Sequence, residues 1–484
     1  MSHLNQTINR RSLLQSGIAA GVYLAGASSK VFAAGANDAI SLGVIGCGWR
    51  GGQLAGLFNK LDGVTVTGLY DPHPSRAFGA RNGQAKSAKA YTDLRKLLED
   101  DGIDAVAIAT CNHWHALAAI WAMQAGKDVY VEKPLAYNQW EGQQVVAAAR
   151  KYSRICQVGT QQRSDPMQAE IKKFLHQEKA LGSIVSARVN RYGRRGSIGK
   201  RTTPLAIDKE INYDIWLGPA QDRPIFRDKF HYDWHWDWNT GSGEMGNWGA
   251  HVLDDLRNNV FQDRVALPRR VMGGGGRVTW NDAGQTPNVH FVYFDTGKIP
   301  VVMGLSNLTE HNSAKRPGPG SGYIAYCEGG RLEGERGRAR AFDKDGKEIR
   351  TFQGTSGEGR HQQNFIDAVR SRDASTLNAE VEVGHLSTGW CNLANIAFRA
   401  GSVFSSEVAQ GVPDNSGQWQ GLVKDMGQLL AAHGGSLDGG GIKLSPMLSV
   451  DAQSEQFVGD HADMANQFLK RQYRAPYVVP EIVS

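Results

Sequence analysis

The sequence predicts an α/β protein with two sheets, and three observations support this class. Short runs of β-branched residues alternate with helical stretches from residue 39 to about 160, as in a parallel sheet covered by helices. Strand-like runs then lie close together between residues 270 and 327, which favours a mainly antiparallel sheet. The 484 residues are 41% hydrophobic and 21% charged, ordinary values for a globular protein that exclude a disordered or collagen-like chain.

The N-terminal domain is expected to span residues 38–160 as a doubly wound parallel sheet. Its strands are predicted at residues 40–45, 64–70, 103–109, 128–131 and 155–158. Its helices are predicted at residues 52–61, 93–100, 116–125 and 138–152. Asn138, followed three residues later by Glu141, is a capping-box arrangement that predicts where the last helix begins.

A second domain is expected at residues 161–405. A helix near 166–181 should lead to a strand at 184–192, and further strands are predicted at 270–280, 289–294, 298–305 and 322–327. Residues 360–370 and 386–404 have helical patterns. From residue 406 to 484 the chain is polar and interrupted by glycine and proline, which suggests an extended arm that could lie over a neighbouring subunit.

The first 33 residues resemble an export signal. Arg10-Arg11 begins a twin-arginine pattern, a short apolar stretch follows, and Val31-Phe32-Ala33 supplies the small residues of a cleavage site. Removing this segment, with its three cations and no acid, lowers the formal charge from +6 to +3. We therefore expect a periplasmic or otherwise exported protein, without nucleic-acid binding. No apolar run reaches the ~20 residues of a membrane helix, so stable membrane insertion is not expected.

The cysteines and the basic residues give no sign of a metal or nucleic-acid site. Five cysteines are widely spaced and lack zinc-ligand spacing, so neither a disulfide framework nor a structural metal is indicated. The one basic cluster is expected to be a solvated face rather than a phosphate site. It comprises Arg188, Arg191, Arg194, Arg195, Lys200 and Arg201.

The first chemical motif is a GxGxxG turn formed by Gly46, Gly48 and Gly51. It follows a strand and opens a helix, and Asp71 ends the next strand 20 residues after Gly51. Such a turn lets a pyrophosphate approach the helix N-terminus, while the carboxylate accepts both ribose hydroxyls. The pattern predicts a Rossmann domain that binds NAD; Arg76 leaves NADP as a second candidate. Trp49 and Arg50, inside the turn, are expected to help enclose the cofactor.

The second motif, Glu132-Lys133-Pro134, ends a strand at the carboxyl edge of the predicted sheet, where open α/β folds bind ligands. A lysine there can be a solvated strand end or a placed acid/base, and the edge position favours the second reading. The proline is expected to fix the turn, with a cis bond as one form. Asn112, His115 and Glu132 share this edge and are expected to contact the cofactor, although His115 could instead cap the following helix.

The third motif spans residues 243–254. If the segment is helical from about Gly246, Asn247 and His251 lie four residues apart on one face and can address one substrate. An equally weighted alternative is a buried histidine that is hydrogen-bonded to Asp254 or Asp255.

The segment 231–238, which alternates histidine or aspartate with aromatic residues, allows three readings. Extended, it would place two histidines and two aspartates on one face and four aromatic rings, Trp236 among them, on the other. A buried aromatic side or a platform for sugar rings is favoured over a metal site, because the ligand set is incomplete. Arg163 and Tyr192 follow strands and are expected, with Trp236, to contact substrate.

Several of these blocks together resemble the Gfo/Idh/MocA oxidoreductases. They are GVIGCGWRGG, Asp71 in YDPHP, NHWHALAAIWAMQAGKDVYVEKPLA, WLGP at 216–219 and GNWGAHVLDD. The resemblance covers about residues 40–405 and implies a C-terminal α/β domain with a large open sheet that mediates homo-oligomer contacts, as a dimer or tetramer. It also implies hydride transfer with a sugar or cyclitol, catalysed by Lys133 and His251. Many members carry aspartate where this chain has Asn247, and an amide cannot take the substrate's proton.

The resulting functional hypothesis is an exported NAD(P)-dependent oxidoreductase that acts on a secondary hydroxyl of a sugar, glycoside or cyclitol. Outside the inner membrane free nicotinamide is scarce, so the cofactor is expected to be tightly bound, partly by the arm after Gly411. Two alternatives remain: a redox-neutral NAD-dependent glycosidase or lyase that uses transient oxidation, and a non-catalytic sugar-binding protein.

Overall fold

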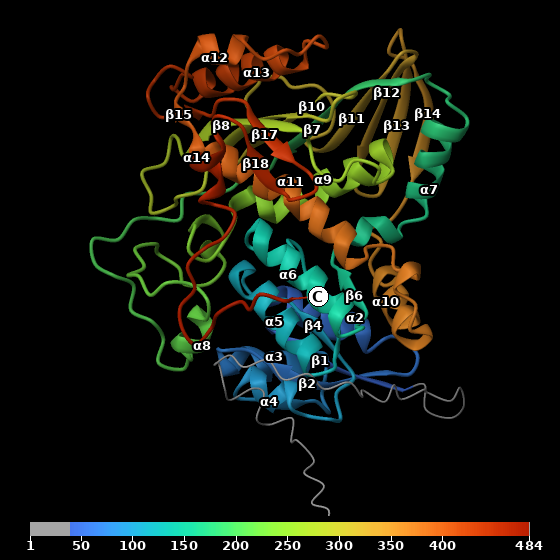
Figure 1. Ribbon diagram of the computed structural model, residues 1–484, viewed down its shortest axis with the longest axis vertical. Coiled ribbons are helices and arrows are strands. Elements are labelled where there is room, and N and C mark those ends of the chain that lie inside the picture. The colour runs from blue at the N-terminus through green and yellow to red at the C-terminus, as the bar shows by residue number, and fades with distance from the viewer. Residues whose placement is uncertain (1–38, 484) are drawn as a thin grey trace, which may run out of the picture.

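A computed structural model describes residues 39–483. These residues form two layered domains, and a long helix packs between them (Figure 1). Residues 1–33, for which an export signal is predicted, lie outside the described residues. In Figure 1 the first domain forms the lower half of the molecule and a large sheet forms the upper half. Within the described part of the chain, no helix has the length and apolar character needed to cross a membrane.

The first domain is a six-stranded parallel sheet in the order β3-β2-β1-β4-β5-β6. This is the Rossmann strand order, with its switch point between β1 and β4. The strands are β1 (Ile40–Ile45), β2 (Val64–Tyr70), β3 (Lys89–Tyr91), β4 (Ala105–Ile108), β5 (Asp128–Val131) and β6 (Cys156–Val158). The helices are α2 (Trp49–Phe58), α3 (Pro74–Gly83), α4 (Leu94–Leu98), α5 (Asn112–Gln124) and α6 (Gln139–Lys151).

The sequence predicted this sheet closely, with two omissions. The short strand β3 and helix α3 were not predicted, because β3 has three residues and α3 has no clear apolar stripe. The predicted helix start is confirmed, and so is one half of the capping box: the Asn138 side chain accepts a hydrogen bond from the Glu141 N–H at 2.9 Å. The reciprocal bond comes from the residue before the N-cap. The Tyr137 N–H donates to the Glu141 carboxylate at 3.2 Å.

The second domain is built on a twelve-stranded, mainly antiparallel sheet, and only β7 and β10 pair in parallel. Its main path runs β14-β13-β12-β11-β7-β10-β9-β8-β16-β15, and β17 and β18 extend it at β8. The longer strands are β7 (Ile184–Tyr192), β8 (Arg270–Gly276), β9 (Val289–Asp295), β10 (Val301–Ser306), β11 (Ser321–Cys327), β12 (Gly330–Glu335), β13 (Arg338–Asp343) and β14 (Glu348–Gln353). The short ones are β15 (Ser402–Val403), β16 (Lys443–Leu444), β17 (Leu448–Asp451) and β18 (Gln456–Val458).

Helices cover both faces of this sheet. On the inner face, α9 and α11 pack over a core that includes Val189, Met303 and Trp390, and Figure 1 shows α11 between the sheet and the first domain. On the outer face, α13 packs around Trp419. The helices after β6 are α7 (Met167–Lys172), α8 (Tyr213–Leu217), α9 (Ala250–Leu256), α10 (Arg360–Ser371), α11 (Val381–Ala400), α12 (Ser406–Gln410), α13 (Gln418–Ala432) and α14 (Ala462–Asn466). Of these, α10 packs into the core of the first domain instead, and α8 into a separate small cluster. Short 3-10 or π turns lie at Gln161–Ser164, Lys173–Gln177, Asp233–Trp236, Met245–Gly249, Arg257–Phe261 and Ala374–Thr376.

Residues 406–483 are not the extended arm that the sequence suggested: they include α12, α13, α14 and the short strands β16–β18. Contact with a neighbouring subunit stays a prediction. After α14 the chain crosses toward the first domain, as Figure 1 shows, and on the way the Arg474 guanidinium pairs with Asp214 of α8 at 2.6 Å. The Tyr473 hydroxyl donates to Glu141 at 3.1 Å. The arm therefore ties the two domains together.

Candidate active site

A cavity of about 700 Å³ lies where the two domains meet, at the carboxyl edge of the parallel sheet. The first domain contributes Gly46, Asp71 and Lys133 to its wall, and the second contributes Asn247 and His251. The structure thus brings together the three motifs that the sequence singled out. Among the described residues, the cavity wall includes none beyond Glu358, so the predicted C-terminal arm does not line it.

The turn between β1 and α2 has the shape that a pyrophosphate requires. Gly46 has φ of +87°, and a Cβ there would lie 2.7 Å from the Ala109 carbonyl oxygen. A Cβ at Gly51 would lie 1.8 Å from the Gly46 carbonyl oxygen. The Gly48 N-cap supplies no side chain, so the first N–H groups of α2 remain available to an anion. These residues fit a dinucleotide.

Asp71 stands at the end of β2, where the sequence placed the ribose-binding carboxylate. Its two oxygens accept hydrogen bonds from the Cys47 N–H at 2.8 Å and the His73 N–H at 2.9 Å. Burial raises the pKa of this carboxyl above its ordinary value. Arg76 also lines the cavity, so the geometry accommodates a nearby phosphate as well.

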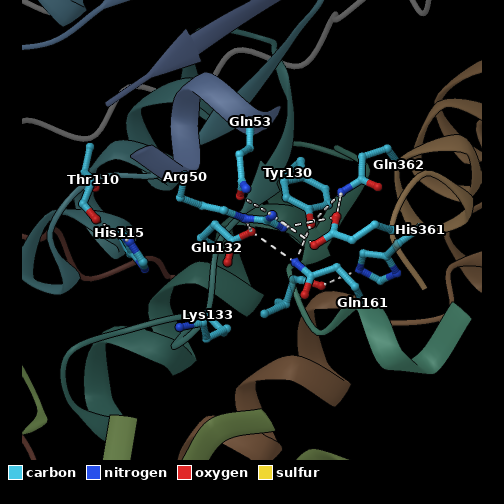
Figure 2. Close-up of polar contacts among 12 residues, drawn as sticks. Arg50, Gln53, Thr110, His115, Tyr130, Glu132, Lys133, Gln161, His361 and Gln362 are labelled. Carbon is cyan, nitrogen blue, oxygen red and sulfur yellow. Dashed lines mark hydrogen bonds and ion pairs between the residues drawn. The ribbon is translucent and has the colours of Figure 1, made fainter. Parts of the chain in front are cut away.

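Glu132 lies in a polar network next to the glycine turn between β1 and α2 (Figure 2). Its carboxylate accepts from Arg50 Nε at 2.7 Å and from Gln161 Nε2 at 3.1 Å. Burial would raise the pKa of Glu132, but Arg50 and Lys133 outweigh it and hold that pKa below its usual value. Arg50 also pairs with Glu358 at 2.9 Å. The network holds the side chain of Arg50 next to the α2 N-terminus.

Asn112, His115 and Trp49 complete the predicted cofactor side of the cavity, and all three line it. The Asn112 side chain accepts from the Ser242 hydroxyl at 3.1 Å. His115 Nδ1 lies 2.7 Å from the Pro134 carbonyl oxygen, so its ring supports the turn after Lys133. Trp49 is 81% exposed at the rim.

Lys133 is held by a residue of the second domain. Its Nζ donates to the main-chain oxygen of Asn247 at 3.1 Å and to the amide Oδ1 at 3.0 Å. The same amide donates through Nδ2 to Glu244 at 3.2 Å. Burial lowers the pKa of Lys133 to about 8, although Glu132 and Glu244 act in the opposite direction. The bond between Lys133 and Pro134 is cis.

His251 lies one turn after Asn247, because a π turn over Met245–Gly249 leads directly into α9. Its ring Nδ1 is buried and has no hydrogen-bond partner among the described residues. Burial, with Arg336 and Lys133, lowers the pKa of His251 well below its ordinary value, so the imidazole is neutral. The alternative of a histidine hydrogen-bonded to Asp254 or Asp255 is wrong, because within the described residues no hydrogen bond joins His251 to either carboxylate. Asp254 instead accepts from Arg163 at 2.8 Å.

Three of the predicted substrate contacts, Arg163, Tyr192 and Trp236, lie outside the cavity wall. Arg163 is almost fully buried between Asp254 and Asp263, at 2.8 Å from each, and takes no part in the cavity wall. Tyr192 packs on the outer face of the large sheet, against Arg316 and the α13 side. Side chains alternate along β7, so it is Arg191, one residue earlier, that points toward the site and pairs with Glu244 at 2.7 Å.

The segment 231–238 is not extended, contrary to the prediction. Residues Asp233–Trp236 form a 3-10 turn, which removes the alternation of faces. Trp236 is buried and absent from the cavity wall, whereas Tyr232, Trp234 and His235 line it. His235 stacks on Trp234 with ring centroids 3.6 Å apart. Aromatic rings of this segment therefore do border the site.

Some functional candidates were missed by the sequence reasoning. Arg195 lines the cavity and pairs with Glu244 at 3.1 Å, although its basic cluster was predicted to be a solvated face. Trp248 and Arg336 also line it. The alternation of side chains along the predicted strand 184–192 places Arg191 on the face opposite Tyr192, which was a signal for Arg191, but nothing local marked Arg336.

Two family models match the chain. "Oxidoreductase family, NAD-binding Rossmann fold" matches residues 40–160, and "Oxidoreductase family, C-terminal alpha/beta domain" matches residues 194–416. Inositol 2-dehydrogenase from Salmonella typhimurium is 30% identical over 184 residues, 37% of this chain and 54% of that protein. A glycosyl hydrolase family 109 protein from Solibacter usitatus is 32% identical over 165 residues, 31% of this chain and 38% of that protein. These matches therefore span about half or less of the relatives' length.

A solved structure has the same fold. The WlbA dehydrogenase from Bordetella pertussis, in complex with NADH and UDP-GlcNAcA, has a TM-score of 0.54 at 18% identity. The match covers 72% of this chain and 94% of that one. The two family models together account for more than half of the residues, and the Rossmann order and the open second sheet agree with them. The chain belongs to the Gfo/Idh/MocA family of NAD-binding oxidoreductases.

Proposed function

We propose that this protein oxidises a secondary hydroxyl of a sugar, glycoside or cyclitol by hydride transfer to NAD. The observation that carries the proposal is the meeting of Lys133 and His251 in one cavity with the glycine turn and Asp71. An acid/base pair beside a dinucleotide site is what alcohol oxidation needs.

The proposed chemistry assigns the proton to Lys133. With a pKa of about 8, part of the lysine is neutral near pH 7.5 and can accept the hydroxyl proton. Asn247 orients Nζ through its two oxygens but cannot take the proton itself. The neutral His251 ring, which lines the cavity, is placed to hold a substrate hydroxyl. When bound, the nicotinamide supplies the hydride acceptor.

The direct test is a panel of sugars, glycosides and cyclitols incubated with the protein and NAD. We expect a ketone product, identified by mass spectrometry, with reduction of bound or added NAD. His251→Ala should lower the rate by about 10²-fold or more while the protein stays folded. A histidine with a purely structural role would instead give reduced stability and an unchanged rate per folded molecule.

The similarity to a glycosyl hydrolase family 109 protein supports one second candidate. The second candidate is a redox-neutral NAD-dependent glycosidase or lyase. In its reaction the oxidation would be transient and would activate the sugar for cleavage, after which the hydride would return to the sugar. Glycosidic cleavage without net NADH, together with exchange of a carbon-bound hydrogen for solvent deuterium, identifies it. If no panel member gives NAD reduction or deuterium exchange, that result would favour a non-catalytic sugar-binding protein.

Export and cofactor retention belong to the same proposal. The twin-arginine pattern at Arg10-Arg11 supports transport of a folded, loaded protein out of the cytoplasm. NAD is favoured over NADP by Asp71, and Arg76 is the residue that would receive a 2′-phosphate. Cell fractionation with and without an Arg10-Arg11→Lys-Lys change tests the export step.

A further inference from the structure

Arg336 is a cation of the cavity wall without a carboxylate partner. It lies in the turn between β12 and β13. Its Nε is buried and has no hydrogen-bond partner, and within residues 39–483 it makes no ion pair. Its one polar contact is Gln161 Oε1 at 3.5 Å, the outer limit of a hydrogen bond. By contrast, Arg50 and Arg195 of the same wall are each paired with glutamate.

The position of Arg336 is at the reacting end of the cavity. Its guanidinium lies 5.9 Å from the ring centroid of Trp248, and the Arg191 guanidinium lies 4.3 Å from the same centroid. The Trp248 and His251 ring centroids are 5.7 Å apart. The part of the wall that fits a pyrophosphate is the glycine turn with the N-terminus of α2. Arg336 is thus placed beside the acid/base pair.

Arg336 differs from its neighbours in having no direct counter-ion. Arg191 and Arg195 share the buried carboxylate of Glu244, and Arg50 pairs with both Glu132 and Glu358. The buried Asp255 carboxyl feels the charge of Arg336 without an ion-pair contact between the two. An uncharged sugar would leave the Arg336 guanidinium without a direct counter-ion, and an anionic group on the substrate would supply one.

We propose that Arg336, assisted by Arg195, binds an anionic substituent, a carboxylate or a phosphate, on the sugar presented to Lys133. The inference rests on the proposed function and narrows its substrate class. A guanidinium presents two parallel N–H donors to such groups, and contact with Trp248 restricts the orientation of the arginine.

Binding is the first measurement, because it does not depend on turnover. Protein loaded with NADH is titrated by calorimetry with glucuronate, galacturonate, glucose 6-phosphate and glucose. We expect at least one anionic sugar to bind 10-fold or more tightly than glucose. Comparison of the two uronates with glucose 6-phosphate shows whether the site prefers a carboxylate or a phosphate. Arg336→Gln should weaken the preferred anion by about 10- to 100-fold, and Arg336→Lys by less.

Arg338→Gln is the matched control, since Arg338 is exposed two residues further along the same hairpin and does not line the cavity. This change should not alter the preference for the anionic sugar over glucose. Equal affinity for glucose and all three anions would overturn the proposal. So would a loss of NADH affinity in Arg336→Gln as large as the loss of anion affinity, which would assign Arg336 to the cofactor phosphates.

The two proposals can fail separately. Tight, Arg336-dependent binding of an anion without oxidation would keep this inference and remove the proposed activity. Oxidation of neutral sugars without a preference for anionic ones would keep the proposed activity and remove the anion site at Arg336.

Discussion

At the residue scale, the chemistry depends on how the protein changes the proton affinity of one lysine. Lys133 sits among Glu132, Glu244 and several arginines, and burial dominates, so its pKa falls to about 8. The folded protein therefore carries a desolvated cation below that pH. A catalytic lysine of this kind is expected to reduce stability.

Lys133→Met tests both consequences. The rate of oxidation should fall by about 10²-fold or more, while NADH still binds. The folded-state pKa lies below the unfolded value of ~10.4, so the unfolded chain binds more protons between pH 8 and 10 and wild-type stability gains with pH in that window. The stability advantage of Lys133→Met should thus be largest at pH 7 and shrink toward pH 10. Denaturant titration at several pH values measures it, with the exposed Lys86→Met as control.

An unchanged rate in Lys133→Met would remove the lysine from the mechanism. A stability difference that does not vary between pH 7 and 10 would contradict the lowered pKa.

Asn247→Asp addresses the departure from the family pattern. A carboxylate in place of the amide would stand about 3.0 Å from Nζ, as Oδ1 does now. An opposite charge so close favours the protonated lysine and should raise its pKa by about 1–3 units. The acid limb of the pH profile of kcat should move to higher pH by a similar amount. Asn247→Ala, which removes the contact without adding charge, should lower the rate without this displacement.

At the element scale, the turn from β1 into α2 sets the geometry of the cofactor site. Gly51 has a backbone oxygen 1.8 Å from the position of a Cβ, whereas Gly52 meets only the end of the Gln84 side chain at 3.9 Å. A side chain is therefore excluded sterically at Gly51, whereas there is space for one at Gly52.

Gly51→Ala should push α2 away from the turn. We expect a loss of about 1–3 kcal/mol in the free energy of unfolding and weaker NADH binding, measured by denaturant titration and fluorescence titration. Gly52→Ala is the control, and it should keep NADH affinity and gain about 0.5–1 kcal/mol from helix propensity. Equal effects of the two changes would show that the close approach at Gly51 does not shape the site.

At the scale of the whole molecule, the cavity is bounded by both domains, and the C-terminal arm ties them together without lining the cavity. Retention of the cofactor must then come from Trp49, Arg50 and the domain boundary. We expect protein purified without added nucleotide to contain NAD(H) near stoichiometric amounts, with Kd near or below ~10⁻⁹ M. Acid extraction and enzymatic assay of the released nucleotide measure the occupancy. Mostly empty protein whose activity requires continuous millimolar NAD would contradict a captive cofactor.

The Rossmann domain, the NAD turn, Asp71 and the strand-end position of Lys133 could be predicted from the sequence, because alternation, glycine spacing and strand ends act over a few residues. The spacing of Asn247 and His251 left a buried histidine equally open, and the resemblance to the Gfo/Idh/MocA family is what pointed to catalysis. The other contacts depend on tertiary packing. Arg163 pairs with Asp254, 91 residues away, and Lys133 with Asn247, 114 residues away. Tyr192 faces outward because the register of β7 in its sheet turned Arg191 inward, and Arg336 reaches the site from a remote hairpin. Such contacts arise from how layers pack, which no local pattern encodes.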